Sequence, residues 1–232
     1  MDNLIEYKGQ ALQDKFVLNI LKKKSDGYFV EIGSNDPVKT NNTYVLENKF
    51  GWSGIMVEYQ SKWVKDYKAL RPNSSFIIKD ATKINYDNLF KRNEAPNQID
   101  YLQIDLDVEN GSTLKVLRKL SRQVMDNYRF ATITFEHDIY RNNYLDTRKR
   151  SRNILKRMGY LRVFGDVNNF KKNSKNISYE DWYVHPDLVD MDHVNDIKRK
   201  NRVHYKHYEA LKLYEDRPEI GKSIDCQDIE YD

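Results

Sequence analysis

A chain of 232 residues is long enough for one well-buried domain with a small appendage. Charged residues make up 32% of it, but the net charge is only +4, so charge balance alone does not indicate a nucleic-acid-binding protein. No stretch approaches the ~20 apolar residues of a membrane span, and the N-terminal residues lack the basic-then-apolar pattern of a signal peptide.

The first predicted unit is a helix followed by a strand, a loop, a helix and a strand. Residues 9–24 place apolar side chains at helical spacing and end in lysines, which suits a helix C-terminus. In residues 28–58, the first strand ends at Gly33 and the second ends on Glu58. Ligands of open α/β sheets bind beyond the carboxyl ends of the strands, where the first loop meets its helix. The segment 28–58 is therefore predicted to bind a nucleoside cofactor.

The glycine content of the first loop separates two classes of cofactor. A dinucleotide needs a glycine-rich turn, but only Gly33 is present, and Pro37 removes a useful backbone donor. S-adenosylmethionine has no phosphate, so one glycine suffices, and Glu58 is placed to accept from both ribose hydroxyls. The pattern favours S-adenosylmethionine, although the spacing to Glu58 suits both cofactors. Taken singly, Gly33 is more typical of a plain turn and Glu58 of a solvated strand end, but their order favours a cofactor site.

The next elements bring a third strand and a candidate adenine contact. Residues 61–71 predict a short helix ending at Pro72, and residues 75–79 predict a strand. Asp80 and Ala81 follow, where an acid beside a small residue is placed to hold an adenine amino group. A helix N-cap is an equally good interpretation of Asp80.

A fourth strand is predicted over residues 100–106, before a helix over residues 112–125. Asp105 and Asp107 are two residues apart and would share a face of that strand, although Asp107 is close to the loop. Acids at the carboxyl end of a strand indicate a functional site. A calcium-binding loop is excluded because its sixth and twelfth positions are not glycine and glutamate.

The fifth predicted strand, residues 130–135, ends in Glu136, His137 and Asp138. These ionisable groups are expected in register with Asp105 on the neighbouring strand, which makes them the best catalytic constellation in the chain. A single histidine is often a structural residue, so both interpretations of His137 remain open.

The sequence after residue 140 predicts a basic helix and the last strands of the sheet. The basic side of the helix is expected to be a solvated face, with a nucleic-acid surface as the alternative. The segments are a helix over 141–158, a strand over 161–167, a mobile loop over 168–178, a strand over 179–186 and one or two helices from 190 onward. One domain is expected, with its core over about 9–189 and a helical extension over 190–232.

Four blocks of sequence together resemble the FkbM-type methyltransferases of the class I, S-adenosylmethionine-dependent superfamily. The blocks are GYFVEIGSND with NNTYVLENKFGWSGIMVE, DYLQIDLD, FATITFEHD and YEDWYVHPDLV. They occur in the family's order between about Gly9 and Val189. The resemblance implies a Rossmann-like α/β fold with a seven-stranded, mostly parallel sheet and helices on both faces. It also implies methyl transfer to oxygen, commonly on sugars or natural-product hydroxyls.

The resemblance also implies site residues. By position, the cofactor-binding residues are Glu31, Gly33 and Asn35 in the first loop, Glu58 for the ribose, and Asp80 with Ala81 at the adenine edge. Asp105 matches the acid of the fourth-strand motif. The chain departs from the family pattern at Pro37, which replaces a second glycine, and at DVENGS, which replaces a Glu-Gly after the fourth strand.

A sugar hydroxyl must lose its proton during methyl transfer, so an acceptor for that proton is needed. The candidate catalytic residues are Asp105, His137 and Glu136. A divalent metal such as Mg²⁺, held by Asp105, Asp107 and Glu136, is the alternative way to acidify the hydroxyl. The predicted function is O-methylation of a sugar hydroxyl of a glycan or glycoconjugate. An RNA 2′-O-methyltransferase and a non-catalytic module with this fold are the alternatives.

The expected partner is thus a sugar or glycan acceptor, and nucleic acid is disfavoured. The single cysteine, Cys226, excludes an internal disulfide and suits a reducing compartment. Abundant Lys, Asn, Ile and Tyr are typical of an AT-rich genome, including viral ones. The expected location is therefore the cytoplasm, or the host cytoplasm for a viral protein.

Overall fold

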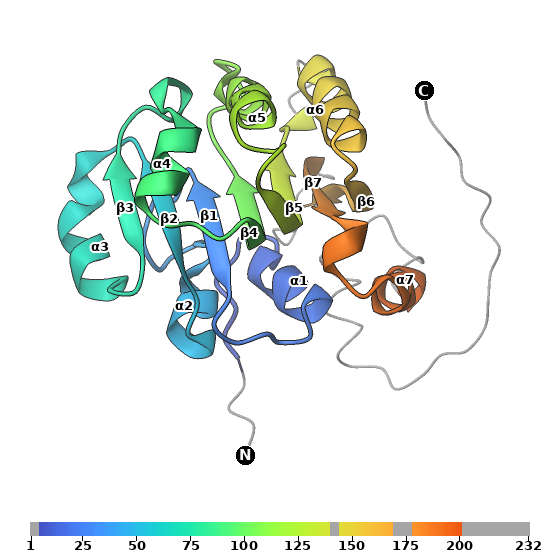
Figure 1. Ribbon diagram of the computed structural model, residues 1–232, viewed down its shortest axis with the longest axis horizontal. Coiled ribbons are helices and arrows are strands. Elements are labelled where there is room, and N and C mark those ends of the chain that lie inside the picture. Colours follow the sequence, from blue (N-terminus) through green and yellow to red (C-terminus); the bar gives the residue numbers. More distant parts are fainter. Residues whose placement is uncertain (1–4, 140–143, 169–177, 201–232) are drawn as a thin grey trace, which may run out of the picture.

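A seven-stranded sheet forms the centre of the molecule in a computed structural model, which describes residues 5–139, 144–168 and 178–200 (Figure 1). The strands are β1 Tyr28–Ile32, β2 Ser53–Glu58, β3 Ser75–Ile78, β4 Gln98–Ile104, β5 Arg129–Glu136, β6 Leu161–Asn168 and β7 Ser178–Val184. Their order is β3-β2-β1-β4-β5-β7-β6. β7 is antiparallel to β5 and β6, and the other pairings are parallel. The expected Rossmann-like methyltransferase fold is confirmed by this mostly parallel sheet.

Helices cover both faces of the sheet. The α-helices are α1 Gln13–Ile20, α2 Tyr44–Phe50, α3 Val64–Leu70, α4 Tyr86–Arg92, α5 Ser112–Gln123, α6 Leu145–Arg157 and α7 Met191–Lys200, and the 3₁₀ helices are η1 Ser61–Trp63, η2 Ala81–Lys83 and η4 Pro186–Leu188. One apolar core packs α4, α5 and α6 against the sheet, and a second packs α1, α2 and α7 with Tyr67 of α3. Figure 1 shows α5 and α6 on one side of the sheet and α1 and α7 on the other. Within the described residues, no helix combines the length and apolar character that crossing a bilayer requires.

The structure adds one helix that the sequence did not predict, and it places the fourth strand two residues earlier, at Gln98–Ile104. In α4, only Tyr86 and Phe90 are fully buried, so its apolar pattern is too short to detect by periodicity. β4 ends at Ile104, so Asp105 and Asp107 follow the strand instead of lying on it. Most of the predicted mobile loop and the end of the predicted C-terminal extension lie outside the described residues.

The strand order reverses between β1 and β4, which is where open α/β sheets bind ligands. Gly33 follows β1 with a φ of 92°, in the region that favours glycine. A Cβ atom at Gly33 would lie 1.7 Å from the carbonyl oxygen of Asp105, the residue that follows β4. The close approach of the two strand ends therefore requires glycine at this position.

Candidate functional site

Glu58 ends β2 beside this reversal point, and backbone donors hold its carboxylate in place. Its Oε2 accepts a hydrogen bond from the Asn35 N–H (2.8 Å), and its Oε1 accepts one from the Gln60 N–H (2.8 Å). The residue is 7% exposed. Each carboxylate oxygen can accept a further hydrogen bond. The geometry therefore suits the ribose-binding role predicted for Glu58.

Glu31 lies under the first loop and supports it. The Glu31 carboxylate accepts hydrogen bonds from Asn41 Nδ2 (3.2 Å) and Thr43 Oγ1 (2.9 Å). Asn41 Nδ2 also donates to the Ser34 carbonyl oxygen (3.0 Å). Burial raises the pKa of Glu31 to about 7. Since Glu31 is 1% exposed, its contacts make it a residue that positions the loop.

Arg71 is fully buried in the same layer, which the sequence did not reveal. It donates from Nε to Glu47 Oε2 (2.8 Å), and from Nη1 to the Pro37 carbonyl oxygen (3.3 Å) and Asn41 Oδ1 (3.0 Å). Its Nη2 donates to Thr43 Oγ1 (2.7 Å). Arg71 therefore fixes the turn that contains Pro37. No local pattern identifies it, because its partners come from distant segments.

Asp80 caps the short helix η2. Its Oδ1 accepts hydrogen bonds from the Thr82 N–H (2.9 Å) and the Thr82 hydroxyl (2.7 Å), and these bonds lower its pKa. Ala81 is 6% exposed and belongs to the apolar core. These contacts fit the N-cap interpretation of Asp80, and the adenine-binding role of Asp80 and Ala81 remains a prediction.

Asp105 and Glu136 meet at the carboxyl ends of β4 and β5, as the sequence predicted. Their carboxyl groups lie close enough for each to influence the pKa of the other. Burial raises the pKa of Asp105. Burial, and then the neighbouring charge of Asp105, raise the pKa of Glu136 well above its ordinary value. Both carboxyls are therefore harder to ionise than exposed carboxyl groups are.

Glu180 of β7 is a third acid at this edge, and the sequence analysis missed it. It pairs with Glu136 across the antiparallel strands and is 2% exposed. Its Oε1 accepts a hydrogen bond from Trp182 Nε1 (2.8 Å). Burial raises its pKa to about 8, and the charge of Asp105 adds to the shift. Only the register of β5 against β7 brings Glu180 to the acid pair, so no local signal identifies it.

His137 does not join the acid pair, which corrects the expected arrangement. Its Nε2 lies 3.5 Å from Asp166 Oδ1 and 3.4 Å from Asp181 Oδ1, and its Nδ1 accepts a backbone N–H at 3.3 Å. Consecutive side chains at the end of a strand point to opposite faces. Glu136 therefore faces Asp105 while His137 faces away, so this geometry does not support His137 as the base.

His137, Asp166 and Asp181 have potential metal-ligand atoms within 4.8 Å of one another. However, Arg152 donates to both carboxylate oxygens of Asp181 (2.7 and 2.8 Å) and to Asp166 (2.9 Å). Arg148 also pairs with Asp166. These guanidinium groups occupy the carboxylate lone pairs and would repel a cation. The cluster is therefore an ion-pair network that links α6 to β6 and β7.

Asp107 does not take part in the predicted metal site. Its exposed carboxylate accepts hydrogen bonds from the Glu109 N–H (3.0 Å) and Asn110 Nδ2 (3.1 Å) in its own loop. Among the described residues, the group spaced for a metal does not include it. A metal held by Asp105, Asp107 and Glu136 is therefore not supported.

No family model matches the chain, and no curated protein matches it. Solved structures of similar fold include a TehB-like SAM-dependent methyltransferase from Corynebacterium glutamicum (9% identity, 75% of this chain and 87% of that chain, TM-score 0.48). A precorrin-6y C5,15-methyltransferase from Geobacter metallireducens is 13% identical over 74% of this chain and 86% of that chain (TM-score 0.47). Fibrillarin from Aeropyrum pernix, which contains natively bound S-adenosyl-L-methionine, is 14% identical over 73% and 74% (TM-score 0.46). Similarity at this level concerns the fold alone.

Proposed function

We propose that the protein is an S-adenosylmethionine-dependent O-methyltransferase whose acceptor is a sugar hydroxyl of a glycan or glycoconjugate. The observation that carries the proposal is the Glu58 carboxylate, held by two backbone N–H groups beside Gly33 where the strand order reverses. An anchored carboxylate suits the two hydroxyls of a ribose. A loop with one glycine supports a cofactor without a pyrophosphate.

The charge at the strand ends also favours this cofactor. S-adenosylmethionine carries a positive sulfonium and a positive ammonium group, and it supplies an already activated methyl group when bound. Asp105, Glu136 and Glu180 form an acidic cluster at the carboxyl edge, in which Glu180 is buried and the other two side chains are half-buried. A cation near such a cluster is stabilised because the interior screens charges weakly.

The acid pair supports proton transfer from a hydroxyl acceptor. The raised pKa values make the Asp105 and Glu136 carboxylates stronger bases than exposed carboxylates. With the cofactor bound, one of these carboxylates would take the proton of the acceptor hydroxyl. The methyl carbon would exchange its bond to sulfur for a bond to the hydroxyl oxygen, and S-adenosylhomocysteine would leave.

Calorimetric titration with S-adenosylmethionine, S-adenosylhomocysteine and NAD tests the cofactor. We expect dissociation constants of roughly micromolar for the first two ligands and no binding of NAD. Glu58→Gln should weaken binding by about 10- to 100-fold, because it removes a charged acceptor. Glu94→Gln, at an exposed position, is the control and should bind as the wild type does.

The outcomes of this titration separate the alternatives. Preferential binding of NAD would replace the proposed cofactor by a dinucleotide. Absence of binding by all three ligands, with a folded protein, would favour a non-catalytic module. Equal affinities of the Glu58 and Glu94 variants would remove Glu58 from the site.

A further inference from the structure

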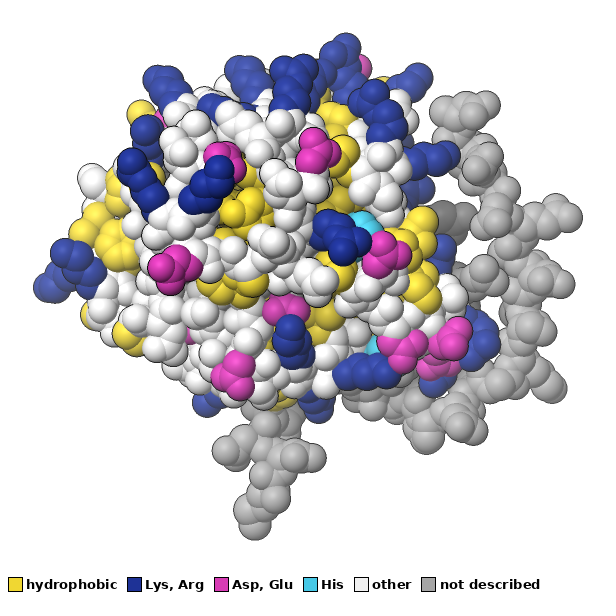
Figure 2. Space-filling view, in the orientation of Figure 1, with side chains coloured by type: hydrophobic (Ala, Val, Ile, Leu, Met, Phe, Trp, Pro, Cys, Tyr) yellow, Lys and Arg dark blue, Asp and Glu magenta, His cyan; other side chains and the backbone are white. Residues whose placement is uncertain are grey.

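Cations gather on the side of the molecule that α5 and α6 cover. Figure 2 shows Lys and Arg side chains along the top of the view, above the helices that Figure 1 places there. Two hollows lie on this surface, of about 400 and 370 Å³. Arg118 borders both hollows, so they lie next to each other. These hollows lie away from the Glu58 carboxylate, so the proposed cofactor site does not account for them.

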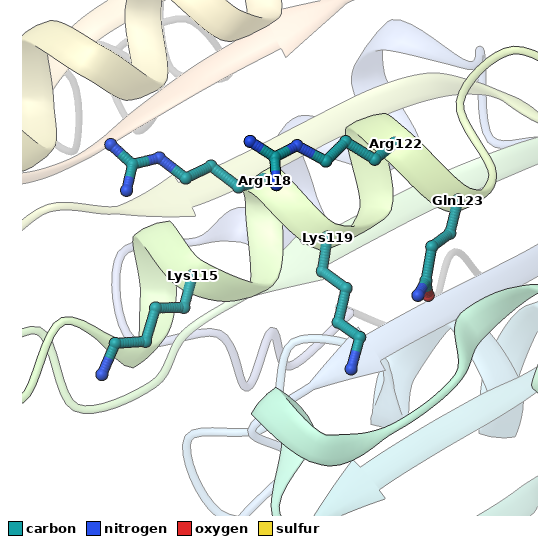
Figure 3. A pocket seen from close by; sticks show the side chains of 5 residues that line it. All are labelled: Lys115, Arg118, Lys119, Arg122 and Gln123. Atoms are coloured by element: carbon teal, nitrogen blue, oxygen red, sulfur yellow. The ribbon is translucent and has the colours of Figure 1, made fainter.

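The lining of both hollows is basic. In Figure 3, Arg118 and Arg122 extend along one flank of α5, whereas Lys119 and Gln123 point to the other flank. Lys119 Nζ donates to the Thr82 carbonyl oxygen (3.0 Å). We define the basic face as Lys115, Arg118 and Arg122 of α5 with Arg150, Lys156 and Arg157 of α6.

Negative charge is scarce around the basic face. The sequence of α5 contains no acid, and α6 contains only Asp146. Asp146 Oδ1 accepts a hydrogen bond from Arg150 Nε (2.7 Å), which neutralises one cation of the set. The remaining cations therefore give this surface a net positive charge.

Helix stability does not explain the charges on α5. Lys115 and Lys119 are four residues apart, as are Arg118 and Arg122, and like charges at this spacing cost about 0.2–0.5 kcal/mol per pair. Lys115 also lies in the first turn, where the helix dipole disfavours a cation. A solvated helix usually alternates its charges to avoid these costs. The unfavourable arrangement is explained by an anionic ligand.

We propose that the basic face binds the phosphodiester backbone of a nucleic acid strand. Arginine presents a fork of donors that matches phosphate oxygens. Lys115 and Arg122 are about 10 Å apart along the helix, which corresponds to the axial rise of about three phosphates of one strand. Among the described residues, Ile154 is the one apolar residue that lines the hollows, and it is 8% exposed. This part of the face therefore lacks the apolar side chains with which an amphipathic helix enters a membrane.

The basic face also leads toward the proposed active site. Lys115 Nζ donates to the Asn110 carbonyl oxygen (3.1 Å), in the loop that begins at Asp105. A strand bound along α5 would thus pass near the acid pair, and its ribose hydroxyls are sugar hydroxyls, as are those of the glycan acceptor proposed above. That acceptor role rests on the proposed function, whereas the binding of nucleic acid does not.

Fluorescence anisotropy with a labelled 20-nucleotide single-stranded RNA, without cofactor, tests the binding. Over about 50–300 mM KCl, we expect log K to fall linearly with log salt, with a slope of roughly −2 to −4 for three to five phosphate contacts. Arg118→Glu/Arg122→Glu on α5 and Lys156→Glu/Arg157→Glu on α6 should each weaken binding at least tenfold. Each should also reduce the slope by about one to two.

The control is Lys65→Glu/Lys68→Glu on α3, which changes net charge equally at exposed positions on the other face. We expect its RNA affinity to fall less than threefold. An equal loss in all three double variants would overturn the proposal, because overall charge alone would then explain binding. Binding to heparin or to anionic vesicles without binding to RNA would also overturn it.

The test is independent of the cofactor. Circular dichroism tests whether each variant is folded. The α5 and α6 variants change different helices, so a folding defect in one variant leaves the other to test the proposal. RNA binding that depends on the basic face would support this inference even if S-adenosylmethionine did not bind. Conversely, normal cofactor binding with no RNA binding would overturn this inference and leave the proposed function intact.

Discussion

Gly33 lies at the closest approach between the ends of β1 and β4. Gly33→Ala would combine a disfavoured positive φ with a Cβ atom 1.7 Å from the Asp105 carbonyl oxygen. We expect the free energy of unfolding to fall by about 3 kcal/mol or more, with loss of cofactor binding. The measurement is urea-induced unfolding.

A second glycine provides the control for this substitution. Gly111 also has a positive φ, 72°, but the nearest atom to an added Cβ is Lys115 Cε at 3.9 Å. In Gly111→Ala, the free energy of unfolding should therefore fall by only about 1 kcal/mol, the cost of a positive φ for alanine. Equal losses at the two positions would show that the close approach at Gly33 is not what requires glycine.

Glu180 makes stability depend on pH. Its pKa is raised from 4.5 to about 8 by burial, so between about pH 5 and 8 the folded chain retains a proton that the unfolded chain has lost. The free energy of unfolding therefore decreases as pH rises through this window. The side chain in Glu180→Gln remains neutral and keeps an acceptor for Trp182. Between pH 5 and 8, the free energy of unfolding of this variant should therefore fall by about 2 to 5 kcal/mol less than that of the wild type.

Urea unfolding at pH 5 and pH 8 measures this difference. The exposed Glu94→Gln variant should keep the wild-type pH dependence. If Glu180→Gln also kept it, proton uptake by Glu180 on folding would be contradicted.

The two orientations at the end of β5 predict different kinetic effects. Glu136→Gln should lower the rate of methyl transfer by about 10²- to 10⁴-fold, because it disrupts the proton-accepting pair. His137→Gln should leave the rate within about threefold, because its ring faces Asp166 and Asp181. Transfer rates at saturating cofactor test this, with thermal melts to correct for unfolded protein. A loss at His137 as large as that at Glu136 would restore His137 as the base.

At the scale of elements, Arg152 attaches α6 to the antiparallel end of the sheet. Burial would raise the pKa of Asp181, but hydrogen bonds from Arg152 and the nearby imidazole of His137 hold it well below its ordinary value. Arg152→Met would leave this fully buried carboxylate without its strongest partner. We expect a loss of about 3–5 kcal/mol in the free energy of unfolding.

A double-mutant cycle with Asp181→Asn measures this coupling. The double variant should be more stable than the sum of the single losses implies, with a coupling of at least about 1 kcal/mol. Additive losses would show that the ion pair does not hold α6 in place.

At the scale of the molecule, the proposed cofactor should stabilise the whole domain. A ligand that binds only the folded state adds about 2.7 kcal/mol at a hundred times its dissociation constant. For a chain of this size, the melting temperature should rise by roughly 5–10 °C. S-adenosylhomocysteine should produce the shift in a thermal melt and NAD should not. A rise with NAD alone would contradict the cofactor assignment.

Local sequence patterns determined much of the fold and part of the site. The apolar runs that became β1 and β2, the glycine at position 33 and the acid at position 58 follow one another closely, so periodicity and turn chemistry identify them. Short helices are exceptions to such patterns, and α4, with two fully buried aromatic residues, is one of them. Asp105 and Glu136 were paired correctly because parallel strand ends meet at one edge of a sheet.

Only the tertiary structure decided which side chains face each other across distant segments. The register of β7 against β5 brings Glu180 to the acid pair, and the bond network of Arg71 explains how the loop accommodates Pro37. The direction of His137 and the continuity of the basic face across α5 and α6 likewise depend on packing. The physical reason is that burial and pairing energies arise between segments far apart in the chain, where local periodicity carries no information.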